Sequence, residues 1–180
     1  MKNSKPRTND GVPDLVLRAI SFAARRHAAQ LRKDQETPYV AHPCRVLFIL
    51  AHVFRVTDPE VLAAGVLHDT IEDTNTDYDD IAKAFGVRVA GFVAALSKDK
   101  RLDEAPREKA FFDGLAAAPL EVKLCKLADT LDNVIDVAGL GPGHGGKMFD
   151  KARHLLRIFD GKIPPEWRHA VDALRAKVEE

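Results

Sequence analysis

The sequence is poor in cysteine, has no surplus of charge of either sign and contains no long apolar run. Only 2 cysteines occur in 180 residues, which excludes a disulfide framework and favours a reducing compartment. Lys and Arg number 27 and Asp and Glu number 27, a balance of +0 that argues against a general nucleic-acid or membrane-surface binder. A small local basic pocket stays compatible with this balance.

Two further absences concern membranes and export. No apolar run approaches the roughly 18 residues that a membrane span needs. The start, MKNSKPRTND, has no apolar stretch after its basic residues, so we expect no signal peptide. The sequence therefore predicts a soluble, cytoplasmic protein with neither a nucleic acid nor a membrane as partner, and it leaves a homo-oligomer open.

Strand patterns are missing as well, because no alternating run is bounded by turn dipeptides. Apolar spacing, proline and glycine instead predict helices. We expect them over roughly 15–33, 43–55, 59–71, 77–86, 89–96, 106–117, 119–137, 147–160 and 165–178. A length of 180 residues fits one domain of roughly 100–200 residues. The prediction is a disordered tail (1–10) and a single all-α bundle of about nine helices (11–180).

Two segments between these helices are interpreted as loops. The charged run from Lys98 to Arg101 is most simply a solvated loop. The glycine-rich segment 138–146, AGLGPGHGG, lacks the Lys-Ser/Thr ending and the preceding strand of a phosphate-binding loop. It is interpreted as a flexible connection that could also close over a site on the preceding helix.

The segment VLAAGVLHDTIEDT begins as an apolar helix and ends in ionisable residues, namely His68, Asp69, Glu72 and Asp73. His68 and Glu72 are four residues apart, as are Asp69 and Asp73, so each pair lies on one helix face. Three crowded carboxylates repel one another, and burying them without a partner is costly. A divalent cation removes this conflict, with His68 and Asp69 as ligands and the other two carboxylates beside it.

Further candidate ligands lie elsewhere in the chain. His42 precedes Pro43 at an expected helix start, and Asp129 is an acid within the apolar pattern KLCKLADTLDNV. Asn133 follows Asp129 by four residues and shares its helix face. Two imidazoles and two carboxylates from three helices would suit Mn²⁺, Fe²⁺ or Zn²⁺. Taken singly, each has a plainer interpretation, as polar surface or as a solvated helix face.

Four strings together make the chain resemble the HD-domain metal-dependent phosphohydrolases, and within them the stand-alone hydrolases of the Rel/Spo alarmone family. These strings are ARRHAAQLRKDQETPYVAHP, AAGVLHDTIEDT, DIAKAFGVRV and KLADTLDN. The resemblance runs from about Leu15 to Gly161. A bare His-Asp pair is common to many hydrolases, whereas the combination of all four strings is far more specific.

The resemblance implies roles for particular residues. The metal ligands would be His42, His68, Asp69 and Asp129, and the metal typically Mn²⁺, with Zn²⁺ or Fe²⁺ as alternatives. Glu72 and Asp73 match the acidic pair that positions and activates the attacking water. The substrate contacts would be Arg32, Lys33, Tyr39 and Asn133, with Lys126 or Arg107 steadying phosphates. His27 matches a family histidine and is interpreted either as an orienter of a ligand or as a core histidine.

The chain departs from the family pattern at two places. Where members often carry a basic pair before the last ligand, this chain has Pro106-Arg107-Glu108-Lys109, with an acid in the middle. Where many have a basic or aromatic residue before the asparagine, it has Asp132. Both changes remove positive charge near the expected phosphate site and leave the substrate in doubt.

The function implied by the resemblance is removal of the 3′-pyrophosphate from the guanosine alarmones (p)ppGpp, with GDP or GTP and pyrophosphate as products. One alternative is a hydrolase of the same scaffold acting on another nucleotide, an adenosine alarmone or the 2′-phosphate of NADPH. A second alternative, from another class, is a non-catalytic module that binds a nucleotide. Such modules usually lose a ligand or the acidic pair, and this chain has both.

Overall fold

The fold is described from a computed structural model, which covers residues 12–139 and 145–179. The expected tail 1–10 and most of the glycine-rich segment 138–146 lie outside these residues. The α-helices are α1 (Val12–Arg26), α2 (Ala41–Phe48), α3 (Pro59–Leu67), α4 (Thr70–Asp73), α5 (Tyr78–Phe85), α6 (Val87–Leu96), α7 (Glu104–Ala117), α8 (Leu120–Ala138), α9 (Gly146–Phe159) and α10 (Arg168–Glu179). A π-helical turn (Ile49–Val53) extends α2, and a 3₁₀ turn (Pro165–Trp167) precedes α10.

The predicted all-α class is confirmed. Within 12–139 and 145–179 no strand occurs, and one isolated bridge joins Leu31 to Pro38. The helices correspond to the nine expected ones, apart from the single turn α4, which is split from the end of the expected helix 59–71. None of the helices in the described part of the chain is long and apolar enough to span a membrane.

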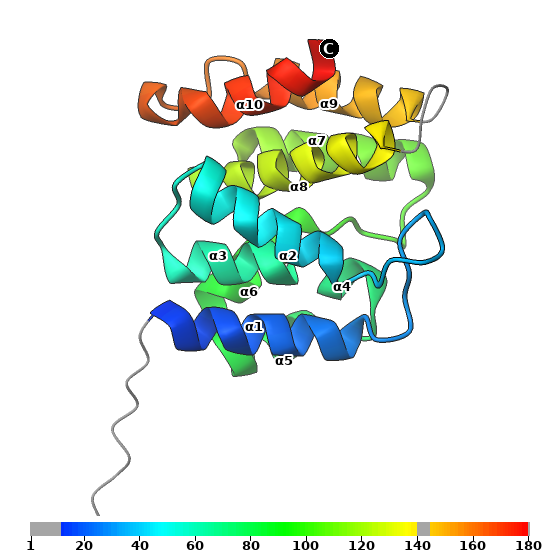
Figure 1. Ribbon diagram of the computed structural model, residues 1–180, viewed down its shortest axis with the longest axis vertical. Helices are drawn as coiled ribbons and strands as arrows, with labels where there is room; N and C mark the ends of the chain where they lie inside the picture. The colour runs from blue at the N-terminus through cyan, green and yellow to red at the C-terminus, as the bar shows by residue number, and fades with distance from the viewer. Residues whose placement is uncertain (1–11, 140–144, 180) are drawn as a thin grey trace, which may run out of the picture.

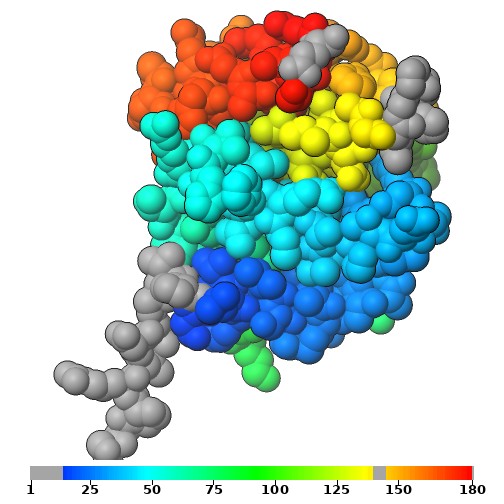
Figure 2. Space-filling view, in the orientation of Figure 1, coloured from blue at the N-terminus to red at the C-terminus, as the bar shows by residue number. Residues whose placement is uncertain are grey.

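The helices stack in layers, with α8 near the centre of the molecule. Figure 1 shows α1 and α5 at the bottom, α2, α3 and α6 in the middle, α7 and α8 above them, and α9 and α10 on top. α8 contacts α2, α3 and α6 below and α9 and α10 above. In the space-filling view α8 (yellow) lies between α2 (cyan) and the C-terminal pair of helices (orange to red) (Figure 2).

The most apolar helix, α3, leads directly to the candidate site. Its first turn is capped by Asp58, whose side chain accepts the backbone N–H of Glu60, and Pro59 occupies the first turn. All residues from Val61 to Leu67 are buried. A Cβ on Gly65 would overlap the Leu50 side chain. Glycine therefore permits the close approach of α3 to α2 and to the π-helical turn that extends it.

The first helix is shorter than predicted, since α1 ends at Arg26 rather than near residue 33. The chain then forms a closed loop in which Arg32 N–H donates to the Thr37 carbonyl and Tyr39 N–H donates to the Gln30 carbonyl. Asp34 stabilises this loop by accepting from the hydroxyl and N–H of Thr37 at 2.6 and 2.9 Å. These local bonds replace helical ones, which is why the apolar spacing misplaced the boundary.

The expected helix 59–71 also breaks, at the pair His68-Asp69. Asp69 has φ −96° and ψ −4°, outside ideal helical values, and α4 begins at Thr70. The Thr70 hydroxyl donates to the Leu67 carbonyl at 2.6 Å, which satisfies a carbonyl that the helix end leaves free. The break changes the direction of the chain where the ionisable residues begin.

Candidate metal centre and adjoining cavity

Two histidines meet at the centre of the molecule. His42 lies in the first turn of α2, and His68 follows the last residue of α3. Their Nε2 atoms are 3.1 Å apart, and their exposed fractions are 1% and 3%. At this distance a proton or a cation lies between the two nitrogens, because two facing lone pairs would repel each other.

The opposite nitrogen of each ring is hydrogen-bonded to an acceptor. His68 Nδ1 lies 2.8 Å from the Gly65 carbonyl oxygen, which can only accept, so Nδ1 carries the proton. His42 Nδ1 lies 2.6 Å from Oδ2 of Asp132, whose carboxylate also accepts. Both Nε2 atoms are therefore left with free lone pairs when the rings are neutral, and these lone pairs face one another.

Two carboxylates complete the cluster. Asp69 Oδ2 lies 3.0 Å from His68 Nε2 and 3.6 Å from His42 Nε2. Asp129, from the middle of α8, places Oδ1 at 3.2 Å from His42 Nε2 and 3.5 Å from His68 Nε2. The ligand atoms of His42, His68 and Asp69 all lie within 4.8 Å of one another. This set of imidazole and carboxylate donors fits a divalent transition metal.

The pKa values of His68 and Asp129 also indicate a positive charge at the cluster. Burial opposes a charged ring at His68, but the Asp69 and Asp129 carboxylates outweigh it and hold the pKa of His68 well above its ordinary value. Burial would raise the pKa of Asp129, whereas the Lys126 ammonium and both histidines hold it well below the usual range. Without a metal ion, a proton supplies the positive charge. A divalent cation would displace that proton on binding.

Around this cluster, side chains from α2 and α8 form an ion-pair network that the sequence interpretation missed. Asp132 accepts from Arg45 Nε at 2.6 Å as well as from His42, and Asp136 accepts from Arg45 and Arg32 at 2.9 and 2.7 Å. Burial would raise the pKa of Asp132, but the bonds from His42 and Arg45 lower it. The available signal was spacing: Asp129, Asp132 and Asp136 follow one helix face.

Asp132 therefore needs a different interpretation from the one that the sequence suggested. The family comparison treated it as a loss of positive charge near the phosphates. Its side chain instead is buried behind His42, 2% exposed, and does not line the cavity described below. It orients the ring, as a hydrogen-bonded carboxylate does behind many metal-binding histidines.

Replacing Asp132 by alanine should weaken divalent-cation binding by roughly 10- to 100-fold, because His42 Nδ1 loses its acceptor. Isothermal titration with Mn²⁺ measures this effect. Asp172→Ala is the matched control, since Asp172 pairs with Arg175 on the exposed part of α10. Equal affinities of the two variants would contradict the orienting role.

A cavity of about 190 Å³ opens beside the cluster. The polar side chains around it belong to Tyr39, Asp69, Glu72, Lys98, Glu108, Lys126, Asp129, Thr130, Asn133 and Lys151. Asp69, Asp129 and Glu72 therefore line a space that can hold a small polar group next to the ring nitrogens. Glu72 Oε2 accepts the backbone N–H of Lys98 at 2.9 Å, which fixes one of its oxygens.

Several residues that the sequence singled out contact the carboxylates of the cluster. The Tyr39 hydroxyl donates to Asp69 Oδ2 at 2.6 Å. Lys126 Nζ donates to Asp129 Oδ2 at 2.7 Å, and Asn133 Nδ2 to Asp129 Oδ1 at 2.6 Å. Burial and the Asp69 charge raise the pKa of Tyr39, so the phenol keeps its proton. These donors hold the two carboxylates in place without occupying the ring nitrogens.

Other candidates lie away from the cavity. The Asp73 side chain is exposed and accepts from Lys100 Nζ at 2.8 Å, and Lys33 is exposed on the loop after α1. Arg107 Nη1 donates to the Leu102 carbonyl at 3.4 Å and lines a separate hollow under the chain between α6 and α7. Arg32 is buried, with its guanidinium bonded to Asp136 and Asn133. The structure thus does not bring these four to the cavity wall.

His27 lies behind Tyr39. The two rings stack with centroids 4.7 Å apart, and His27 Nδ1 lies 2.7 Å from Gln30 Oε1. Its Nε2 is buried and has no hydrogen-bond partner among the described residues. His27 therefore contacts the cluster through Tyr39, whose hydroxyl donates to Asp69.

Residues 98–101 form a loop, as expected, but the expected solvation of Lys98 is wrong. Its side chain is 20% exposed, lines the cavity and pairs with Glu108 at 2.9 Å. The sequence had no signal for this, because the contact joins the segment after α6 to α7. Arg101, by contrast, is 89% exposed, as expected for a solvated loop.

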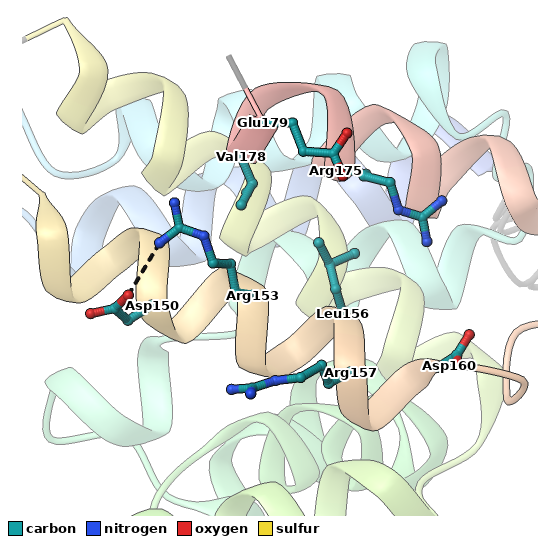
Figure 3. A pocket seen from close by; sticks show the side chains of 8 residues that line it. All are labelled: Asp150, Arg153, Leu156, Arg157, Asp160, Arg175, Val178 and Glu179. Carbon is teal, nitrogen blue, oxygen red and sulfur yellow. Dashed lines mark hydrogen bonds and ion pairs between the residues drawn. The ribbon is translucent and has the colours of Figure 1, made fainter.

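A wider hollow of about 760 Å³ lies on the outer side of α9 and α10. None of the residues that line it also lines the cavity beside the cluster. Figure 3 shows Arg153 bonded to Asp150 on the same helix, with the guanidinium groups of Arg153 and Arg175 pointing away from each other. Charged side chains that pair locally and do not converge indicate a solvated groove rather than a binding site.

Comparison with known proteins agrees with this geometry. The family described as HD domain matches residues 19–160. The guanosine-3′,5′-bis(diphosphate) 3′-pyrophosphohydrolases MESH1 of Danio rerio and Homo sapiens are 41% and 42% identical to the chain, each over 68% of it and 69% of their own length.

Solved structures show the same relationship. One is a metazoan ortholog of SpoT that hydrolyzes ppGpp; it has a TM-score of 0.78 and 30% identity, over 97% of this chain and 98% of that one. Another, a protein of Listeria monocytogenes EGD-e, has a TM-score of 0.62 and 26% identity, over 79% of this chain and 97% of that one.

Proposed function

The chain belongs to the HD-domain family, and from this premise we propose that it is a metal-dependent hydrolase that removes the 3′-pyrophosphate from (p)ppGpp. Water and substrate would give GDP or GTP and pyrophosphate. The observation that carries the proposal is the cluster of His42, His68, Asp69 and Asp129 opening into a cavity that contains lysines. The MESH1 relatives, named for this reaction, support the substrate.

We propose that this cluster holds one Mn²⁺ ion, with Zn²⁺ or Fe²⁺ as alternatives. The donor set supports a divalent ion because two free imidazole lone pairs and two carboxylates converge on one place. When bound, the metal supplies Lewis acidity that offsets charge developing on phosphoryl oxygens. Free thiols at Cys44 and Cys125 support a reducing, cytoplasmic location.

Among the chain's own residues, Glu72 is the proposed base. It lines the cavity beside Asp69 and Asp129, and the Lys98 N–H holds its Oε2. A carboxylate so placed takes a proton from the attacking water as the oxygen bonds to phosphorus. The bond between that phosphorus and the 3′-oxygen then breaks, and the nucleoside keeps its 3′-oxygen.

Asp73 has a different position and a different proposed role. It is paired with Lys100, while its backbone carbonyl accepts from Gln30 at 2.7 Å. We infer that it positions α4, and with it Glu72, instead of contacting water itself. We infer that Lys126 and Asn133, which bond to Asp129 on the same helix and line the cavity, donate to substrate oxygens.

Product analysis tests the proposed function. Purified, Mn²⁺-loaded protein is incubated with ppGpp, ppApp and NADPH in parallel, with Asp69→Ala as the blank. Release of pyrophosphate and GDP from ppGpp, lost in the variant, is expected. Cleavage of only ppApp or NADPH would keep the chemistry and overturn the substrate. If none of the three compounds is cleaved, the alternative of a non-catalytic module that binds a nucleotide would be favoured.

Metal removal should destabilise the protein, because the cluster joins α2, the end of α3 and α8. A ligand present at about 100 times its Kd stabilises the folded state by about 2.7 kcal/mol. For a chain of this size that corresponds to a fall in Tm of roughly 5–10 °C after treatment with EDTA. Differential scanning fluorimetry measures the fall, and excess Mn²⁺ should restore the Tm. A Tm unaffected by EDTA in protein shown to contain metal would contradict the site.

A further inference from the structure

The lining of the cavity contains a group of charges that the proposed reaction has not used. Lys98 comes from the segment after α6, Glu108 from α7 and Lys151 from α9, and all three line the cavity. Glu108 Oε1 lies 2.9 Å from Lys98 Nζ and 3.5 Å from Lys151 Nζ. One carboxylate thus holds two ammonium groups that belong to different parts of the chain.

These charges are partly shielded from solvent. The side chains of Lys98 and Glu108 are 20% and 24% exposed, and that of Lys151 is 50% exposed. Burial alone would raise the pKa of Glu108, but the two lysines lower it. Glu108 is therefore ionised, and within this group of three side chains two ammonium groups against one carboxylate leave one positive charge.

An aromatic ring connects Lys98 with Lys126, the lysine next to the metal centre. Lys98 Nζ and Lys126 Nζ each lie 5.3 Å from the centroid of the Phe111 ring. Lys126 in turn reaches Asp129. The cavity lining therefore includes carboxylates and three lysines, and the Phe111 ring lies 5.3 Å from two of those lysines.

We propose that Lys98 and Lys151 form a binding subsite for the phosphate groups of the substrate that are not cleaved, with Glu108 as an internal counter-ion that those phosphates displace. The inference rests on the proposed function for the identity of the nucleotide. Each ammonium group has three donors, and Glu108 occupies only one on each lysine. A diphosphate offers several anionic oxygens and can satisfy both lysines at once.

The size of the cavity supports displacement. At about 190 Å³ it is smaller than the roughly 300 Å³ at which small-molecule sites begin, so a whole nucleotide requires side chains to move. The pair between Glu108 and Lys151 joins α7 to α9 at 3.5 Å, and Lys151 is its more exposed partner. Exchange of Glu108 for phosphate on Lys151 would release this contact and widen the cavity between the two helices.

The subsite also supplies positive charge in place of the basic pair that the sequence lacks before the last ligand. Arg107 points elsewhere, and Glu108 occupies the wall in its place. Positive charge then comes from Lys98 and Lys151, which are distant from Glu108 in the chain by 10 and 43 residues. Their contribution could be found only once the helices were placed.

The test uses the Mn²⁺-loaded, full-length protein with three variants, Lys98→Met, Lys151→Met and Glu108→Gln. Lys109→Met is the matched control, because Lys109 neighbours Glu108 but is 78% exposed and pairs with Asp113. Calorimetry measures binding of GDP, with guanosine as the probe that lacks phosphate. Steady-state kinetics with ppGpp give KM and kcat for the same proteins.

The two lysine variants are expected to bind GDP about tenfold more weakly or worse and to raise the KM for ppGpp more than they lower kcat. Glu108→Gln should bind GDP several-fold more tightly, because no carboxylate competes with phosphate. Binding of guanosine should be the same in all variants. Lys109→Met should match the unaltered protein in both measurements.

Either of two binding results would overturn the subsite, namely GDP affinity unchanged in both lysine variants or GDP affinity lowered in Glu108→Gln, and a kinetic result given below would do the same. The proposed function fails separately. If ppGpp is not cleaved while GDP binding depends on Lys98 and Lys151, the subsite stands and the substrate is a different phosphorylated nucleotide. If ppGpp is cleaved with the same KM in every variant, the function stands and the subsite is wrong.

Discussion

Asp69→Ala is expected to lower pyrophosphate release from ppGpp by about 1,000-fold or more. Asp69 is one of the donors around the ring nitrogens, 3.0 Å from His68 Nε2, and its loss removes the charge that a divalent ion needs there. A bound metal contributes several kcal/mol to stabilising developing charge, and each 1.36 kcal/mol is a factor of ten in rate. Pyrophosphate release is measured together with the metal content of the purified variant.

The fold should survive this change. Asp69 is not a core residue, and its main partners besides the cluster are the Tyr39 hydroxyl and the turn into α4. Circular dichroism should therefore show helix content close to that of the unaltered protein. Asp113→Ala, which removes an exposed acid from α7, is the control for activity. Full activity of Asp69→Ala, with metal still bound, would exclude Asp69 as a ligand.

Glu72→Gln is expected to lower kcat by roughly 100- to 10,000-fold while the affinity for Mn²⁺ stays within a few-fold. The glutamine keeps the size of the side chain and an oxygen that can accept the Lys98 N–H, but it cannot take a proton. Steady-state kinetics with ppGpp and calorimetric titration with Mn²⁺ measure the two quantities.

Asp73→Asn provides the comparison for Glu72. Because its side chain is exposed and paired with Lys100 rather than facing the cavity, we expect a smaller fall in kcat than for Glu72→Gln. Equal losses in the two variants would mean that the acidic residues act as one unit. A rate that Glu72→Gln leaves intact would remove Glu72 from the role of base.

The sequence predicted a helix boundary well where a capping residue or a proline marked it. Pro59 and Asp58 mark the start of α3, and Asp77 caps α5 through the backbone N–H of Asp80. It failed where a side chain outside the helical pattern ended the helix. Asp34 and Thr37 build the loop after α1, and Thr70 closes the end of α3. Hydrogen bonds of this kind leave no trace in apolar spacing.

The candidate cluster was partly predictable for a similar reason. The order His68-Asp69 and the spacing to Glu72 are properties of one segment, so a local pattern could suggest them. His42, before Pro43 at an expected helix start, and Asp129, an acid in an apolar pattern, were candidates with plainer interpretations when taken singly, and the resemblance to the family then implied that both are ligands. That all four converge depends on the close approach of α2 to α3 at Gly65 and on the central position of α8. No local pattern contains those distances.

By itself the sequence determined the all-α class and the residue types that suit a divalent ion, because these follow from composition and short-range periodicity. Only the tertiary structure decided which polar groups share the cavity. It placed Asp132 behind His42, turned Arg107 and Asp73 away, and brought Lys98 and Lys151 to Glu108. Such contacts join residues far apart in the chain, and they form because helices pack by their apolar faces, which fixes where the polar faces meet.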